Sequence, residues 1–134
     1  MRYVYPAIIT VEKGKFLVSV PDLTGLHTFG NSMADALFMA QDAIAMWLWD
    51  AENKGETIPQ ASNQKKISRM CKSPGQIISI VAADTDEYRR QNDTRAVKKT
   101  LSIPSWLNNQ AEKANAPFSQ ILQQGLKEYL QIAQ

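Results

Sequence analysis

The stretch Val97-Lys98-Lys99-Thr100-Leu101-Ser102-Ile103-Pro104 determines how the C-terminal part of this chain is interpreted. Side chains alternate between the two faces of a β-strand, so a strand here would place Val97, Leu101 and Ile103 on one face, with Lys99 on the same side. The opposite face would carry a lysine and two hydroxyls: Lys98, Thr100 and Ser102. Pro104 ends the strand and favours a helix start, because its fixed φ suits a first helical turn.

Two short helices are expected after this strand. Apolar residues recur at helical spacing from Trp106 to Ala114 and again from Ile121 to Tyr129. Asn115-Ala116 interrupts the pattern, and Pro117 fits the first position of the second helix. Residues 95–134 therefore read as one strand and two helices.

Such a unit cannot fold alone, because it has too little core and its strand has no pairing partner. A two-fold homodimer removes both problems, since two strands pair antiparallel and four helices bury their apolar face. The polar face of that ribbon fits the major groove of B-DNA, and the dimer would read an inverted repeat in operator DNA. Free backbone N–H groups around Phe118 and Ser119, at the start of the second helix, would contact a phosphate.

This order of elements resembles the ribbon-helix-helix family over about residues 95–131. The resemblance implies that Lys98, Thr100 and Ser102 contact the bases. The family often begins its second helix with Ser-Arg-Ser, where this chain has Pro117-Phe118-Ser119. That difference favours backbone amides over an arginine as the phosphate contact.

The front part of the chain predicts an antiparallel sheet covered by one long helix, so the fold class is α+β. Strands are expected over residues 3–11, 16–20 and 27–30, with a hairpin turn at residues 12–15. A helix from Asn31 or Ser32 to Lys54-Gly55 would cover the sheet. Residues 77–82 are apolar enough to predict a well-buried strand added to that sheet. Residues 61–75 read as a polar connection or irregular excursion, and residues 84–94 as a short helix and linker.

The long helix carries a second apolar stripe, formed by Phe38, Ala45 and Trp49. An isolated two-layer unit has no use for a second apolar face. Two explanations stay open: burial against the rest of the chain, or a protein–protein interface.

The front part also resembles the HicB antitoxin family. The likeness rests on Tyr5-Pro6-Ala7, on the run from Phe16 to Gly25, on the stretch from His27 to Ser32, and on an alanine-rich helix. It implies a partial RNase H-like domain over residues 1–90 that binds a HicA toxin, a small RNA-binding mRNA interferase. Residues 91–134 would then be the ribbon-helix-helix domain for dimerisation and DNA binding, with which the protein represses its own operon. The expected toxin contacts are Asp22, Leu23, His27, Phe38 and Trp49.

The distribution of charge is compatible with these two partners. The 134-residue chain has a net charge of +2. Residues 1–60 hold seven acidic and four basic residues, whereas residues 95–134 hold two acidic and five basic ones. An acidic front would suit a basic RNA-binding toxin, and a basic rear would suit DNA.

The sequence favours neither an enzyme nor a metal site, and it implies no cofactor. Asp35, Asp42 and Asp50 are spread along the long helix and cannot converge on one metal ion. His27 is the only histidine and Cys71 the only cysteine, with no nucleophile–base pair or phosphate-binding glycine loop. One cysteine and no long apolar block suit a cytoplasmic protein.

A second function fits the same residues. The chain would then be a ribbon-helix-helix regulator whose front domain senses a small ligand. A ligand that changes operator affinity, in the absence of any protein partner, would distinguish it from an antitoxin.

Overall fold

The computed structural model describes residues 1–132. The chain divides into two compact units, Met1–Arg95 and Ala96–Gln134, which we call the front and rear units. Each is described by itself.

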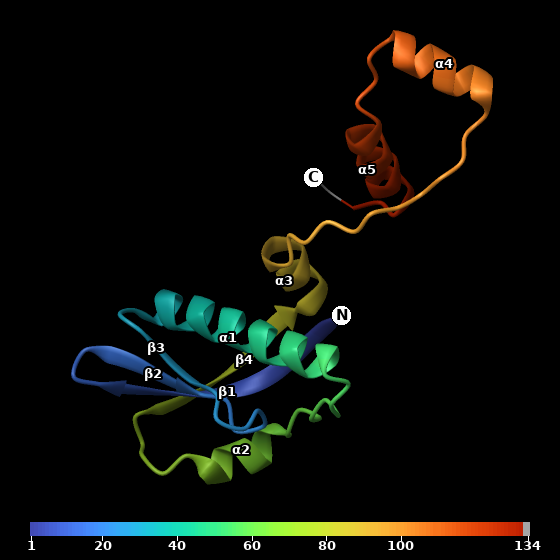
Figure 1. The fold of residues 1–134 in the computed structure, drawn as a ribbon. Helices are drawn as coiled ribbons and strands as arrows, with labels where there is room; N and C mark the ends of the chain where they lie inside the picture. Colours follow the sequence, from blue (N-terminus) through green and yellow to red (C-terminus); the bar gives the residue numbers. More distant parts are fainter. Residues whose placement is uncertain (133–134) are drawn as a thin grey trace. The chain divides into compact units, whose positions relative to one another are not determined.

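The front unit is built on a four-stranded antiparallel sheet of order β3-β2-β1-β4 (Figure 1). The strands are β1 (Arg2–Glu12), β2 (Lys15–Ser19), β3 (His27–Gly30) and β4 (Gln76–Asp84). Lys13 and Gly14 link β1 to β2 with φ values of 50° and 78°. Positive φ at both turn residues matches the twist of a tight hairpin, so the expected turn is confirmed.

Helix α1 (Met33–Asn53) covers one face of the sheet. Its first turn is capped by Ser32, whose Oγ accepts the Asp35 N–H at 3.1 Å. The helix ends at Asn53, with Lys54 as its C-cap, so the expected helix is confirmed at both ends. Its buried residues pack on β-strand side chains to form the core, which includes Tyr5, Ile9, Val18, Leu23, Ile44, Leu48 and Val81.

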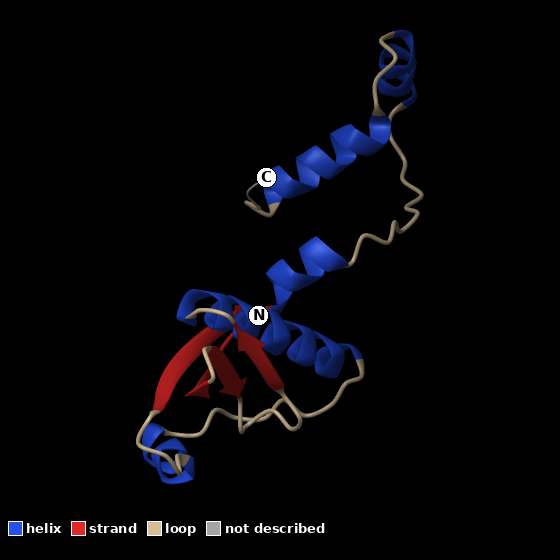
Figure 2. Ribbon diagram, turned by 90° about the vertical axis from the view of Figure 1, so that its left-hand side faces the viewer, coloured by secondary structure: helices blue, strands red, loops and turns tan. Residues whose placement is uncertain are grey.

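The opposite face of the sheet is partly covered by α2 (Gln64–Met70), as both ribbon views show (Figures 1 and 2). The prediction of an irregular connection over residues 61–75 was wrong in this part. Asn63 caps the helix through a 2.9 Å bond from the Lys66 N–H, and Ile67 is fully buried. A single apolar anchor in a polar sequence gives too weak a periodic signal to predict such a helix.

Strand β4 pairs with β1 along its whole length, which confirms that the chain returns to the sheet. The expectation of a well-buried strand was wrong, because β4 is an edge strand. Ile80 is 62% exposed, and in this strand only Val81 and Ala83 are buried. Helix α3 (Thr85–Asn92) follows directly, with Asp84 as its cap, and confirms the short helix expected there.

The rear unit contains helices α4 (Ser105–Lys113) and α5 (Phe118–Tyr129), and both expected helices are confirmed. They are separated by a turn in which Asn115 has a φ of 54°. Residues 93–104 form neither helix nor strand. A strand needs a partner strand, which a single chain does not supply for residues 97–103, so pairing there stays a prediction. None of residues 96–132 is buried.

Candidate partner-binding surfaces

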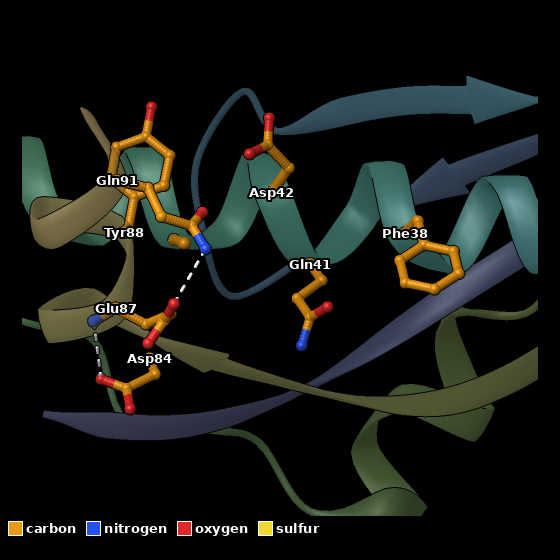
Figure 3. Close-up of a pocket in the computed structure, with 8 residues that line it drawn as sticks. Phe38, Gln41, Asp42, Asp84, Glu87, Tyr88 and Gln91 are labelled. Carbon is orange, nitrogen blue, oxygen red and sulfur yellow. Dashed lines mark hydrogen bonds between the residues drawn. The ribbon is translucent and has the colours of Figure 1, made fainter. Parts of the chain in front are cut away.

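The front unit has a groove between α1 and α3 (Figure 3). Helix α1 contributes four residues at helical spacing: Phe38, Gln41, Asp42 and Ala45. The end of β4 and helix α3 contribute the others: Asp84, Glu87, Tyr88 and Gln91. We call this site the α1–α3 groove.

The groove combines an exposed aromatic ring with three carboxylates and no basic side chain. Phe38 is 71% exposed, which is unusual for a phenylalanine without a partner. Asp84 is near Arg2, at 3.7 Å, and Glu87 forms an ion pair with Arg90. Asp42 has no ion pair within residues 1–132 and presents its charge to solvent. An aromatic anchor beside an unpaired carboxylate fits a partner with a basic surface.

The apolar surface continues from this groove along the edge of β4. A second hollow shares Phe38 and Gln41 with the first and adds Leu37 and Ile80. The Gln41 side-chain amide donates to the Ala82 carbonyl at 3.0 Å, so it satisfies one backbone group of the open edge. The groove and this strip together form one surface with an apolar centre and an acidic end.

Helix α3 is held on α1 by ring packing and by a polar network. The Trp49 and Tyr88 rings lie 5.5 Å apart with an interplanar angle of 52°. Glu52 of α1 accepts hydrogen bonds from the Tyr3 hydroxyl at 2.8 Å, the Thr85 hydroxyl at 2.9 Å and Arg89 at 3.2 Å. These contacts fix the walls of the groove.

The network shifts the pKa of two of its members. Burial alone would raise the pKa of Glu52, but hydrogen bonds from Tyr3, Thr85 and Arg89 hold it below its ordinary value. Burial and the hydrogen bond to Glu52 raise the pKa of Tyr3 to about 12. Glu52 is therefore a charged acceptor and Tyr3 a neutral donor across the neutral pH range.

The structure does not bring the five expected toxin contacts together. Phe38 lies in the α1–α3 groove, whereas Trp49 is half-buried and packs against Tyr88. His27 is exposed and lines a separate hollow with Leu17 and Ser19 of β2. These residues therefore belong to different surfaces.

The other two expected contacts hold the fold in this structure. Leu23 is 1% exposed and belongs to the core. The Asp22 carboxylate accepts from the Ser62 N–H at 2.9 Å and from the Ser62 hydroxyl. Both side chains are thus engaged by their own chain.

The expected DNA contacts are all accessible in the rear unit. Lys98, Thr100 and Ser102 are exposed, and none of their side chains forms a hydrogen bond within the described chain. Phe118 and Ser119 are the first two residues of α5, which has no side-chain cap. The N–H groups of this first turn are therefore available to a ligand.

Most residues of the α1–α3 groove were not predicted from the sequence. A signal for the α1 wall was present, since Gln41 and Asp42 stand three and four residues after Phe38, next to it on the helix surface. No comparable signal existed for Asp84, Glu87 and Tyr88, because their position depends on how α3 packs on α1.

Two further absences concern residues 1–132. No group of three or more histidine, cysteine or acidic side chains among them is arranged to hold a metal ion. No helix in that range has both the length and the apolar character needed to cross a membrane.

Comparison with known proteins gives the family. The model of the HicB-like antitoxins of bacterial toxin–antitoxin systems matches residues 5–127. A toxin–antitoxin complex from Streptococcus pneumoniae is similar at 24% identity and a TM-score of 0.60, covering 96% of this chain and 99% of that chain. The Burkholderia pseudomallei antitoxin HicB is 20% identical with a TM-score of 0.55, and 98% of each chain is covered.

A complex of HicA3 and HicB3, toxin and antitoxin, is 26% identical with a TM-score of 0.52 and covers 61% of this chain and 99% of that chain. No curated protein is similar enough in sequence to match. The family match spans nearly the whole chain, and the chain therefore belongs to the HicB-like antitoxins, a non-catalytic family.

Proposed function

We propose that this chain is an antitoxin that binds a HicA-like toxin through its front unit and represses its own operon through its rear unit. Family membership supports the first part, and a solved relative at 26% identity is a complex of toxin and antitoxin. The partners of this proposal, an mRNA-cleaving toxin and operator DNA, place the protein in the cytoplasm.

The α1–α3 groove is our candidate for the toxin site. The observation that carries this choice is the exposed Phe38 ring beside the unpaired Asp42 carboxylate. An RNA-binding toxin presents basic side chains, which complement Asp42, while Phe38 offers an apolar anchor. The expected contacts are therefore Phe38 and Asp42, in place of Asp22 and Leu23, whose side chains serve the fold.

The rear unit is our candidate for the DNA-binding dimer. Its apolar side chains are all at least partly exposed, as the 62% exposure of Leu101 and the 63% exposure of Trp106 illustrate. A second copy would cover them and pair the two Val97–Ile103 segments as a ribbon. Lys98, Thr100 and Ser102 would then face the bases, and the amides of Phe118 and Ser119 a phosphate. The partial RNase H-like and ribbon-helix-helix descriptions of the two units, with a boundary near residue 90, are part of this proposal.

The toxin part is tested by co-expression with the small basic protein encoded next to this gene. Phe38→Ala and Asp42→Lys should each weaken binding of that protein by about 1–3 kcal/mol, as expected at a central anchor. His27→Ala is a matched control on another surface. If both groove variants bind and neutralise the toxin like the parent while His27→Ala does not, the toxin site lies on the other face of the sheet.

The DNA part is tested by titrating operator DNA. Lys98→Ala and Thr100→Ala should each weaken specific binding by about 1–3 kcal/mol. On random DNA, Lys98→Ala should lose only the contribution of one charge, and Thr100→Ala should match the parent. Lys127→Ala in α5 is a control with the same change in charge. Ser119→Pro removes a backbone N–H at a position where a helix tolerates proline, and it should weaken binding to all sequences alike.

Overlapping binding curves for the Lys98 and Thr100 variants and the parent would mean that the ribbon does not read the bases. A small molecule that alters operator affinity, with no toxin encoded nearby, would favour the ligand-sensing regulator instead.

A further inference from the structure

The front unit carries a basic patch on the side of the sheet opposite α1. Between residues 57 and 83 the sequence has four basic residues and no acidic one. All four are exposed on α2 or just after it: Lys65, Lys66, Arg69 and Lys72. We call them the α2 patch.

The patch differs from the rest of the front unit in having no counter-charge. None of its four side chains forms an ion pair or hydrogen bond within residues 1–132. Most other cations of the unit are paired with carboxylates: Arg2 with Asp84, Lys54 with Asp50, Arg89 with Glu52, Arg90 with Glu87, and Arg95 with Asp93. Lys15 lies 5.1 Å above the Phe29 ring. Apart from Lys13 in the β1–β2 turn, the front-unit cations without a partner in the described chain all lie in the α2 patch.

The α2 patch is held firmly by the sheet beneath it. Ile67 is fully buried and anchors the helix, while Ser62 just before the helix is bonded to Asp22. After the helix, the Gln76 side chain accepts the Lys72 N–H at 2.7 Å and donates to Thr10 at 2.9 Å. At about 100° per residue, Lys65, Lys66 and Arg69 lie within one side of the helix and Ile67 on the other. The cations thus project together into solvent from a fixed base.

We propose that the α2 patch binds the phosphate backbone of double-stranded DNA beside the operator, without reading its sequence. Exposed lysine and arginine with amide and hydroxyl neighbours, here Gln64 and Ser68, are the groups that contact phosphates in protein–DNA complexes. DNA rather than an acidic protein is the chosen ligand because the rear unit of the same chain is the proposed DNA-binding module. When that unit holds its site, the α2 patch meets flanking DNA at high effective concentration. The choice of DNA thus rests on the proposed function.

The test uses the full chain with Lys65→Gln, Lys66→Gln and Arg69→Gln combined. A matched control, Lys13→Gln, Lys15→Gln and Lys54→Gln combined, removes the same charge from other parts of the front unit. Affinity is measured against salt concentration on three DNA duplexes: the operator trimmed to its site, the operator with long flanks, and a long random sequence. The same titration is repeated with a single-stranded RNA. Circular dichroism verifies that each variant is folded.

On both long duplexes the slope of log affinity against log salt, which is negative, should be about 2–3 smaller in magnitude for the α2 variant, since each lost phosphate contact contributes about 0.9. On the trimmed operator it should match the parent, and the control should match the parent throughout. If the α2 variant and the parent have equal slopes on long DNA, the patch does not bind DNA, and the proposal of operator recognition by the rear unit is unaffected. If the parent binds operator and random DNA equally well, the repressor proposal is wrong. If the α2 variant still differs from that parent in slope on random DNA, the proposal for the patch stands. A slope change on single-stranded RNA but not on duplex DNA overturns the choice of DNA.

Discussion

The two units of this chain differ in how far they bury their apolar side chains. In the front unit, α1 and the sheet enclose a core in which Ile9, Ile44 and Leu48 have no exposed surface. In the rear unit, Leu101, Trp106 and Leu126 keep between 51% and 63% of their surface exposed. Folding stability depends mainly on burial of apolar surface, so only the front unit is complete as one chain. The rear unit leaves comparable apolar side chains exposed, and in the proposed function a second copy covers them.

The largest expected effect is on the proposed dimer interface of the rear unit. Leu101→Asp would place two unpaired charges in the core of a rear-unit dimer, at a cost of several kcal/mol per charge. We expect the variant to be monomeric by sedimentation and to lose operator binding, while the melting of the front unit is unchanged.

Thr100→Asp is the matched control for sedimentation, because it introduces the same side chain in the same segment but on the opposite, polar face, and it should sediment like the parent. If Leu101→Asp still sediments like the parent, the apolar side of residues 97–103 is not the dimer core. If it also lowers the melting temperature of the front unit, the two units do not fold independently.

The next effect tests how closely the front unit is packed. A Cβ atom on Gly30 would lie 2.3 Å from the backbone nitrogen of Ala36, and backbone atoms cannot move away as a flexible side chain can. Gly30→Ala should therefore lower the free energy of unfolding by about 1–3 kcal/mol, or more. Urea unfolding followed by tryptophan fluorescence measures it. Gly55→Ala, which has no atoms nearby but a φ of 69°, separates packing from backbone strain. If Gly30→Ala lowers the free energy of unfolding by less than Gly55→Ala does, α1 can shift on the sheet.

The sequence was sufficient to predict elements whose signal is local and periodic. The α1 helix follows from apolar residues at helical spacing and from the Ser32 cap, and the β1–β2 hairpin from Lys13-Gly14 between two β-forming runs. Both rear helices follow from their spacing and from Pro104 and Pro117. In each case the residues that specify the element lie within it.

Features that depend on a distant contact could not be predicted in the same way. The apolar run of β4 suggested burial, but its place at the sheet edge depends on strand order, which the run does not encode. Helix α2 depends on one anchor, Ile67, and on the Asp22–Ser62 bonds across 40 residues. Asp22 and Leu23 were expected on a binding loop because loops often carry recognition, yet one fastens α2 and the other fills the core.

A smaller effect concerns the polar network that holds α3 on α1. The lowered pKa of Glu52 means that its contribution to stability is present above its ordinary pKa of 4.5 and is lost as the pH falls through the lower folded value. The raised pKa of Tyr3 means that its contribution is present below 10 and is lost as the pH rises toward about 12. The front unit should thus be most stable between these limits.

Glu52→Gln should cost about 1–2 kcal/mol at pH 7, because it removes charged hydrogen bonds from a half-buried site. It should also flatten the acid side of the stability profile. Asp50→Asn removes an exposed ion pair with Lys54 and should change neither the stability at pH 7 nor the acid side of the profile measurably. An unchanged acid profile in Glu52→Gln would show that other carboxylates govern acid unfolding.

The smallest effect, and the one that bears most directly on the difference between the units, is at Gly125 in α5. Unlike Gly30, it has no atom within 4 Å of an added Cβ, and like Gly30 it has no positive φ. In the single chain, Gly125→Ala should therefore stabilise the helix by about 0.5–1 kcal/mol. In a dimer the sign depends on whether a second copy approaches α5 at this point. Melting at increasing protein concentration distinguishes the two situations. If Gly125→Ala raises the melting temperature by the same amount at every protein concentration, Gly125 faces solvent. If the variant melts higher than the parent at low concentration but lower at high concentration, the partner packs against Gly125. Only the second result would give Gly125 in the rear unit the role that Gly30 has in the front unit, that of admitting a neighbouring backbone.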